Sequence, residues 1–271
     1  MLSIRKIWAV ARVSLLELLR RRDVYVALIL AVVLVVPLST VNFFGVEGIV
    51  RHLREVSLLL IWLFSVVIAI TTAARQIPGE LQRRTILPLL ARPIRRSEVV
   101  LGKYVGSALA ASAALLLFYL CYVLLTGLLS EPQAETTRMQ ATLMHMDMTM
   151  GQAILMHLAF VWLLTAMTMA GSLILTVSAN LTCCALVAVG MLLFGEQLPK
   201  IADQAVFPAS WIVRLAHYVL PHFEFYDSRV RLIHEWGAYD WGVLAIVLLY
   251  TLLYIAFLMI FSTLVFNRKR L

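Results

Sequence analysis

The chain has 271 residues, of which 62% are hydrophobic and 14% are charged, with a net charge of +8 and a mean hydropathy of +0.91. This is more apolar surface than one soluble core of this length needs to bury. The glycines and prolines, 12 and 8 in number, are too few for a low-complexity or fibrous chain. We therefore expect an all-α integral membrane protein.

The first 23 residues predict an amphipathic helix that precedes the membrane domain. Apolar side chains recur at helical spacing opposite charged ones: Ile4, Trp8, Ala11, Leu15 and Leu18 against Arg5, Arg12 and Glu17. Charges at Glu17 and from Arg20 to Asp23 interrupt the stretch, which is therefore not a secretory signal. We expect this helix to lie on the inner leaflet, either as a topological anchor or as a contact for a cytoplasmic partner.

Residues 24–271 predict a membrane domain with six spans. A span needs about 20 apolar helical residues. The charge-free runs 24–44, 56–74, 104–129 and 241–266 each qualify. A fifth run, 148–195, would reach on the order of 70 Å as one helix, so it predicts two crossings. We place the turn between them at Ser178, Ala179 and Asn180, because small polar residues favour local hydrogen bonds over helix continuation.

The basic residues predict the orientation of these spans. Sixteen of the 23 Lys and Arg residues precede the first span, separate the second from the third, or end the chain. Basic residues in short loops stay in the cytoplasm, so we expect both termini on the cytoplasmic side. The membrane we expect is the plasma (inner) membrane. The positive charge then reflects topology and contact with anionic membrane lipid, and nucleic acid is not expected as a partner.

The segment 196–221 predicts two short re-entrant helices between the fifth and sixth spans. It is apolar in part but is broken by prolines and charges, so it cannot cross the membrane. Helices dipping into the outer leaflet would place Trp211 and Tyr218 at the level of the lipid headgroups.

The motifs of common catalytic sites fail here, so we expect no enzyme. A phosphate-binding loop before Lys103 would need glycine and a hydroxyl residue where Ser97 and Tyr104 stand. His234 and Glu235 begin a zinc-protease motif that does not continue. No predicted span contains a charged residue, which argues against a proton relay or intramembrane proteolysis, and we assign His157 a packing or hydrogen-bonding role.

A metal site is also not expected, although one cluster is a candidate. Thioether and imidazole groups suit Cu(I), but alternating methionines would not share one helical face. The candidates are Met144, His145, Met146 and Met148. The three cysteines fall within predicted spans and are expected to be small buried apolar groups.

Residues 76–103, which we call the coupling segment, are basic, amphipathic and interrupted by prolines. Such a segment suits a membrane surface against a soluble partner. Its run of Glu80, Thr85, Leu87, Leu89, Leu90, Pro93, Arg96, Val100, Leu101, Gly102 and Lys103 resembles the signature of the ABC-2-type transporter permeases. The resemblance extends to the N-terminal helix, the six spans and the broken segment after the fifth. One departure is Arg84, where the family usually has glycine.

The resemblance implies a permease that pairs with a second copy or a related permease, each bound to a separate cytoplasmic ATPase that carries ATP and Mg. This chain would hold no cofactor of its own. A cytoplasmic coupling helix between the second and third spans would lie at 81–91. The residues it implies for ATPase coupling are Glu80, Arg83, Arg84, Thr85, Ile86, Leu87, Leu90, Pro93, Arg96, Gly102 and Lys103. A solvated basic loop that only obeys the charge rule is the simpler alternative.

Two functions follow from this resemblance. Charge-free spans favour an amphipathic cargo that is exported or flipped along apolar helix faces. The alternative is a subunit that transmits mechanical energy to an outer-face protein without moving a solute, in which case the methionine cluster would bear on metal-cofactor maturation. A large protein bound over 222–240 and 129–147 would distinguish the second function from the first.

Overall fold

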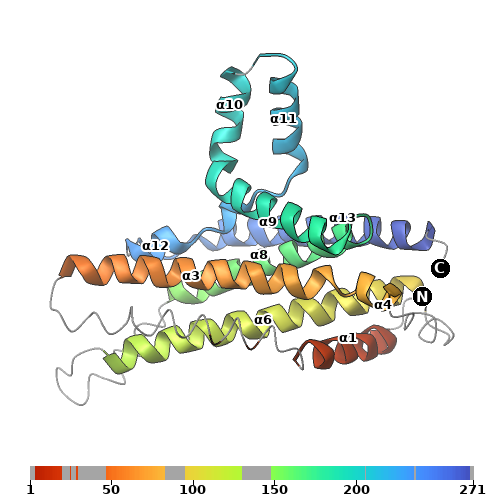
Figure 1. Cartoon of the computed structure of the whole chain (residues 1–271). Coiled ribbons are helices and arrows are strands. Elements are labelled where there is room, and N and C mark those ends of the chain that lie inside the picture. Colours follow the sequence, from red (N-terminus) through yellow and green to blue (C-terminus); the bar gives the residue numbers. More distant parts are fainter. Residues whose placement is uncertain are drawn as a thin grey trace.

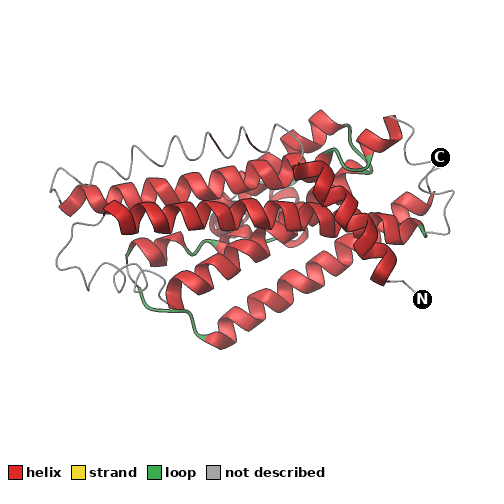
Figure 2. Cartoon of the chain, turned by 90° about the horizontal axis from the view of Figure 1, so that it is seen from below, coloured by secondary structure: helices red, strands yellow, loops and turns green. Residues whose placement is uncertain are grey.

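The computed structural model describes residues 4–19, 25, 29, 47–82, 95–129, 148–204, 206–234 and 236–268. Within these residues the chain forms helices and loops but no strand, which confirms the all-helical prediction (Figure 2). The elements are α1 (Ile4–Leu19), α3 (Glu47–Ala74), α4 (Pro78–Gln82), α6 (Arg96–Leu129), α8 (Met148–Ser172), α9 (Val177–Phe194), η2 (Gly195–Gln197), α10 (Leu198–Gln204), α11 (Ala209–Val219), η3 (Phe223–Tyr226), α12 (Arg229–Ile233) and α13 (Trp241–Arg268).

Five of the described helical stretches are long and apolar enough to cross a membrane. They comprise most of α3 and α6 and the whole of α8, α9 and α13, and so correspond to the second to sixth predicted spans. The first predicted span, 24–44, lies outside the described residues apart from Tyr25 and Ile29, so a sixth crossing stays a prediction. The protein is therefore a multi-pass membrane protein.

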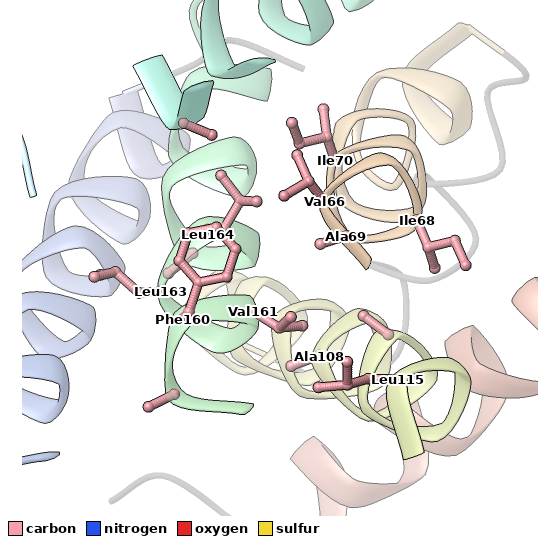
Figure 3. Packing of buried hydrophobic residues seen from close by; sticks show 14 of the residues in the cluster. Val66, Ile68, Ala69, Ile70, Ala108, Leu115, Phe160, Val161, Leu163 and Leu164 are labelled. Carbon is pink, nitrogen blue, oxygen red and sulfur yellow. The ribbon is translucent and has the colours of Figure 1, made fainter. Parts of the chain in front are cut away.

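Helices α3, α6 and α8 pack together and bury the core, while α9 and α13 flank them and expose more of their residues (Figure 1). Figure 3 shows this core where Val66 of α3, Ala108 of α6 and Val161 of α8 gather. Phe160 is completely buried, and its ring stacks on that of Trp62 with 5.2 Å between the ring centroids. Since lipid is as apolar as these side chains, close packing rather than water exclusion stabilises the three helices.

Helix α6 begins at Arg96 rather than at residue 104, where the charge-free run begins. The Glu98 carboxylate accepts a hydrogen bond of 2.9 Å from the Arg95 backbone N–H, which satisfies a donor that the helix start would otherwise leave open. Lys103 is consequently part of a membrane-spanning helix. The first turns of α6 therefore carry Arg96, Glu98 and Lys103, and the expectation of a charge-free span, which rests on a start at residue 104, stays a prediction.

The turn between α8 and α9 falls at 173–176, earlier than the predicted turn at 178–180. Thr176 caps α9, because its hydroxyl accepts a bond from the Ala179 N–H. Asn180 instead faces α8, where its amide donates to the Thr168 carbonyl at 2.9 Å. A Cβ at Gly171 would lie 2.2 Å from the Asn180 side-chain oxygen, so only glycine admits this contact.

Helices α10 and α11 form a hairpin that projects sideways from the bundle (Figure 1). The two helices pack on each other, and α11 has no buried residue. Its outward side chains are large and apolar: Trp211, Ile212, Leu215, Tyr218 and Val219 are each at least 58% exposed. Two short helices therefore form where the broken segment predicts them, whereas their position in the outer leaflet stays a prediction.

Candidate functional site

The structure describes four of the predicted coupling residues, and all four lie around the start of α6. Three belong to α6 itself (Arg96, Gly102 and Lys103), and Glu80 belongs to α4. Figure 1 places α4 and the start of α6 at the end of the bundle where α13 finishes. The other seven, Arg83, Arg84, Thr85, Ile86, Leu87, Leu90 and Pro93, lie outside the described residues.

Lys103 forms a buried ion pair with Glu80. Its ammonium lies 2.6 Å from the carboxylate oxygen Oε1 and donates to the Gln76 backbone carbonyl at 3.2 Å. The Lys103 side chain is 2% exposed, and that of Glu80 is 24% exposed. A charge inside a membrane-spanning helix is tolerated when it is paired and hydrogen-bonded in this way. The pair joins the start of α6 to the segment that follows α3.

Arg96 connects the same end of α6 to the last turn of α13. Its guanidinium donates to the carbonyls of Phe266 and Asn267, at 3.3 and 3.1 Å. Carbonyls at a helix C-terminus have no partner within their helix and carry partial negative charge, so a cation there is favourable. Arg96 therefore serves to hold two helices together within this chain.

Gly102 and Gly106 of α6 form the surface on which α1 packs. A Cβ at Gly102 would lie 2.6 Å from the Val10 Cβ, and one at Gly106 would lie 2.7 Å from the Ala11 carbonyl oxygen. Val10, Ala11 and Ser14 of α1 are buried here. Small residues four apart allow two helix backbones to approach closely in a membrane.

The face of α1 that packs differs from the predicted apolar face. Ala11 is buried, but Ile4 and Trp8 are 82% and 58% exposed. Close approach to the two glycines selects small side chains rather than the largest apolar ones. The exposed large side chains are available to contact lipid. The location of α1 at the inner leaflet stays a prediction.

Of the metal candidates, only Met148 is described, and it is an exposed residue at the start of α8. Met144, His145 and Met146 lie outside the described residues. Across the described ranges, no group of three His, Cys, Asp or Glu side chains is arranged to hold a metal ion. Cys121, Cys183 and Cys184 are free thiols, of which only Cys184 is buried.

A hydrogen-bonded network that motif analysis does not reveal joins α3, α6 and α8. Ser65 donates to the Trp62 carbonyl at 2.7 Å, so its oxygen is left to accept from His157 Nε2, also at 2.7 Å. The other ring nitrogen, Nδ1, then accepts from the Tyr119 hydroxyl at 3.1 Å. This arrangement satisfies a neutral imidazole completely, which agrees with the hydrogen-bonding role predicted for His157.

Polar contacts join α12 and its neighbouring residues to the bundle, at the end opposite α4 (Figure 1). Arg229 binds both carboxylate oxygens of Asp227 at 2.8 Å and lies over the Trp62 ring. The Tyr239 backbone exchanges two hydrogen bonds with the Gln152 side chain, at 2.6 and 3.1 Å. Burial alone would raise the pKa of Asp227, but the bonds and charge of Arg229 outweigh it and hold that pKa below its usual value.

The base of the α10–α11 hairpin meets α13 through two histidines and a tyrosine. The Tyr250 hydroxyl accepts a bond of 3.2 Å from the His222 backbone N–H, and the ring of His217 lies across that of His222 at 4.6 Å. Burial, together with the neighbouring His217, lowers the pKa of His222. These contacts fix where the hairpin leaves the bundle.

Comparison with known proteins identifies the family of this chain. Residues 8–271 match the family model described as "ABC-2 family transporter protein". The chain belongs to the ABC-2 family. It is also 29% identical over 134 residues to the "Probable ABC transporter permease protein NosY" of Stutzerimonas stutzeri. That match covers 46% of this chain and 47% of the relative, so the chain spans about half the length of the curated relative it matches.

Proposed function

We propose that this chain is the permease subunit of an ABC transporter and works with a separate cytoplasmic ATPase to export or flip an amphipathic substrate. Membership of the ABC-2 family and the similarity to a permease support this function. The main structural support for this function lies at the start of α6, where α4, α13 and α1 all contact one helix. A second copy of this chain, or a related permease, completes the transporter.

The proposed mechanism begins at the coupling segment between α3 and α6. Ile86, Leu87 and Leu90 fill a groove on the ATPase, and Arg83 and Arg84 meet charges at its rim. Closure of two ATPase subunits on ATP displaces the segment. The packed helices to which it is attached then shift as units, because close-packed interfaces move between discrete arrangements rather than deforming continuously.

An amphipathic cargo fits the chemistry of the described spans. Lys103 and Glu98 are buried charged residues of α6, and Lys103 is paired with Glu80, so it is unsuited to holding a polar solute. The peripheral helices α9 and α13 instead present apolar side chains such as Leu186 and Leu252, 67% and 61% exposed. A lipid-like molecule can move along such faces without losing an apolar environment.

Replacing Ile86, Leu87 and Leu90 with aspartate tests the proposal. We expect the variant to insert and fold but to lose copurification of the cytoplasmic ATPase. A matched variant with aspartate at three exposed positions of the opposite end, Phe225, Val230 and Trp236, should retain it. Undiminished copurification by the first variant would contradict the assignment of the coupling segment.

A second candidate function is supported by the contacts of the described residues 222–234 and 236–240. The paired Asp227 and Arg229 and the two bonds between Gln152 and Tyr239 give these residues a fixed shape. A fixed surface of this kind would suit a subunit that passes ATP energy to an outer-face protein without moving a solute. Capture of a soluble outer-face protein that is lost on Gln152→Ala, with the ATPase still bound, would favour this function over transport.

A further inference from the structure

We propose that Glu80 and Lys103 are positioning residues that fix the upstream end of the coupling segment to α6, so that α6 receives the displacement produced by the ATPase. The inference rests on the proposed function and names the helix that moves. It follows from where the buried ion pair lies relative to the two ends of the segment.

The stretch of the coupling segment between Glu80 and Arg96 is attached at both ends to the first turns of α6. The downstream end continues directly into Arg96, where the helix begins. The upstream end is held by Glu80, whose partner Lys103 lies about 10 Å further along the α6 axis. Two attachments this close together on one helix form a rigid base, so force on the segment acts on α6.

The connection back to α3 is short, and its turn is also bonded to α6, because Lys103 donates to the Gln76 carbonyl at 3.2 Å. Helix α3 ends at Ala74, a turn follows at 75–77, and α4 has five residues. A helix of this length has little stability of its own. Gly79 lies within it, with no atom within 4 Å of where a Cβ would be. Without the ion pair, the chain would bend here and the displacement would not reach the bundle.

The packing of α1 on α6 means that α1 moves together with α6. Gly102, beside Lys103, and Gly106 one turn further on hold α1 through contacts too close for any larger side chain. Movement of α6 at this level therefore carries α1 with it. Lys103 and the two glycines lie within one and a half turns of α6, and with Glu80 and α1 they define the moving unit.

The test uses the complex of the permease with its ATPase in lipid nanodiscs. The three native cysteines are first changed to alanine. New cysteines are then introduced at two exposed positions, Leu120→Cys on α6 and Leu155→Cys on α8, and each carries a spin label. The distance between the labels is measured without nucleotide and after trapping with ATP and vanadate. We expect a shift with native Glu80 and Lys103 and loss of the shift in the Glu80→Leu, Lys103→Met double variant.

The double variant separates positioning from folding. Replacing both members of a buried ion pair with apolar residues preserves packing, whereas removing one member destabilises strongly. The double variant should therefore bind the ATPase and hydrolyse ATP while α6 stays still. A matched variant that neutralises the exposed pair Asp203 and Arg214, which lie 2.9 Å apart, should keep the shift.

A full shift in the Glu80→Leu, Lys103→Met variant would overturn the inference, as would loss of the shift in the exposed-pair variant. Failure of the chain with native Glu80 and Lys103 to bind an ATPase at all would contradict the proposed function instead. The two failures are therefore distinguishable.

Discussion

His157 shows how a polar side chain is accommodated in the middle of this bundle. Ser65 has one proton, which it gives to the Trp62 carbonyl, so His157 must donate from Nε2. Ser65→Ala would leave that N–H buried without an acceptor. We expect a loss of about 1–3 kcal/mol in the free energy of unfolding, measured in detergent by thermal or denaturant titration.

Thr182→Ala provides the control for this prediction. Thr182 is exposed on α9 and donates to the Ser178 carbonyl of its own helix, so the change removes a hydroxyl without leaving a buried group unsatisfied. Its stability should be close to that of the unmodified chain. Equal effects of the two substitutions would contradict the network as described.

The Asp227–Arg229 pair predicts a dependence of stability on pH. The pKa of Asp227 is lower in the folded protein than in the unfolded chain, where it is about 3.9. The pair therefore contributes its full stability above about pH 4, and the contribution disappears as pH falls through the lower, folded pKa. We expect Asp227→Asn to lower the melting temperature at neutral pH, and the difference from the native chain to shrink at the most acidic pH that the protein tolerates. A pH-independent difference would show that the carboxylate charge is not responsible.

At the scale of elements, the glycines of α6 determine where α1 lies. Gly106→Leu would drive a side chain into the Ala11 backbone, which cannot move aside as a flexible side chain could. We expect α1 to detach from α6 and become sensitive to trypsin at Arg5 and Arg12. Limited proteolysis followed by mass spectrometry of the N-terminal fragments measures this directly.

Gly190→Leu on α9 is the matched control. A Cβ at Gly190 would meet no atom within 4 Å, so the added side chain enters open space. The N-terminal cleavage pattern should not change. Equal protection of α1 in the Gly106 and Gly190 variants would contradict the close packing.

The length of each charge-free run predicts most of the long helices, because a helix that crosses an apolar layer must consist mainly of apolar residues. The start of α6 could not be predicted in this way. Counting charges places the start of the span after Lys103. The Lys103 side chain is nevertheless buried, because it forms an ion pair with Glu80 of another helix. Pairing between segments distant along the chain is not visible in the hydropathy of either one.

The packing face of α1 was missed for a related reason. Periodicity finds the largest apolar side chains, Ile4 and Trp8, and both are exposed. The signal that could have found the contact is the Gly102–Gly106 spacing on the partner helix, which is present in the sequence. The turn after α8 was misplaced because Asn180 looks like a loop residue until its bond to Thr168 is known.

At the scale of the molecule, three closely packed helices carry two peripheral ones and a projecting hairpin (Figure 1). The hairpin is apolar on the outside, and its exposed pair Asp203 and Arg214 lies 2.9 Å apart. Apolar side chains with Trp and Tyr among them suit the outer headgroup layer. Trp211→Phe should therefore remove part of the quenching of tryptophan fluorescence by lipids brominated near the headgroup. Unchanged quenching would argue that Trp211 lies away from the headgroup layer.

The orientation of the whole molecule gives a last prediction. Basic residues gather around α1, the coupling segment and the end of α13, so this end should face the cytoplasm and the hairpin should face outward. Single cysteines at Val206 of the hairpin and Asn267 of α13, both exposed, would be introduced into a chain lacking the native cysteines. In intact cells a membrane-impermeant maleimide should label position 206 and should label position 267 only after permeabilisation. Labelling of position 267 in intact cells would reverse the topology, and the coupling segment could then not meet a cytoplasmic ATPase.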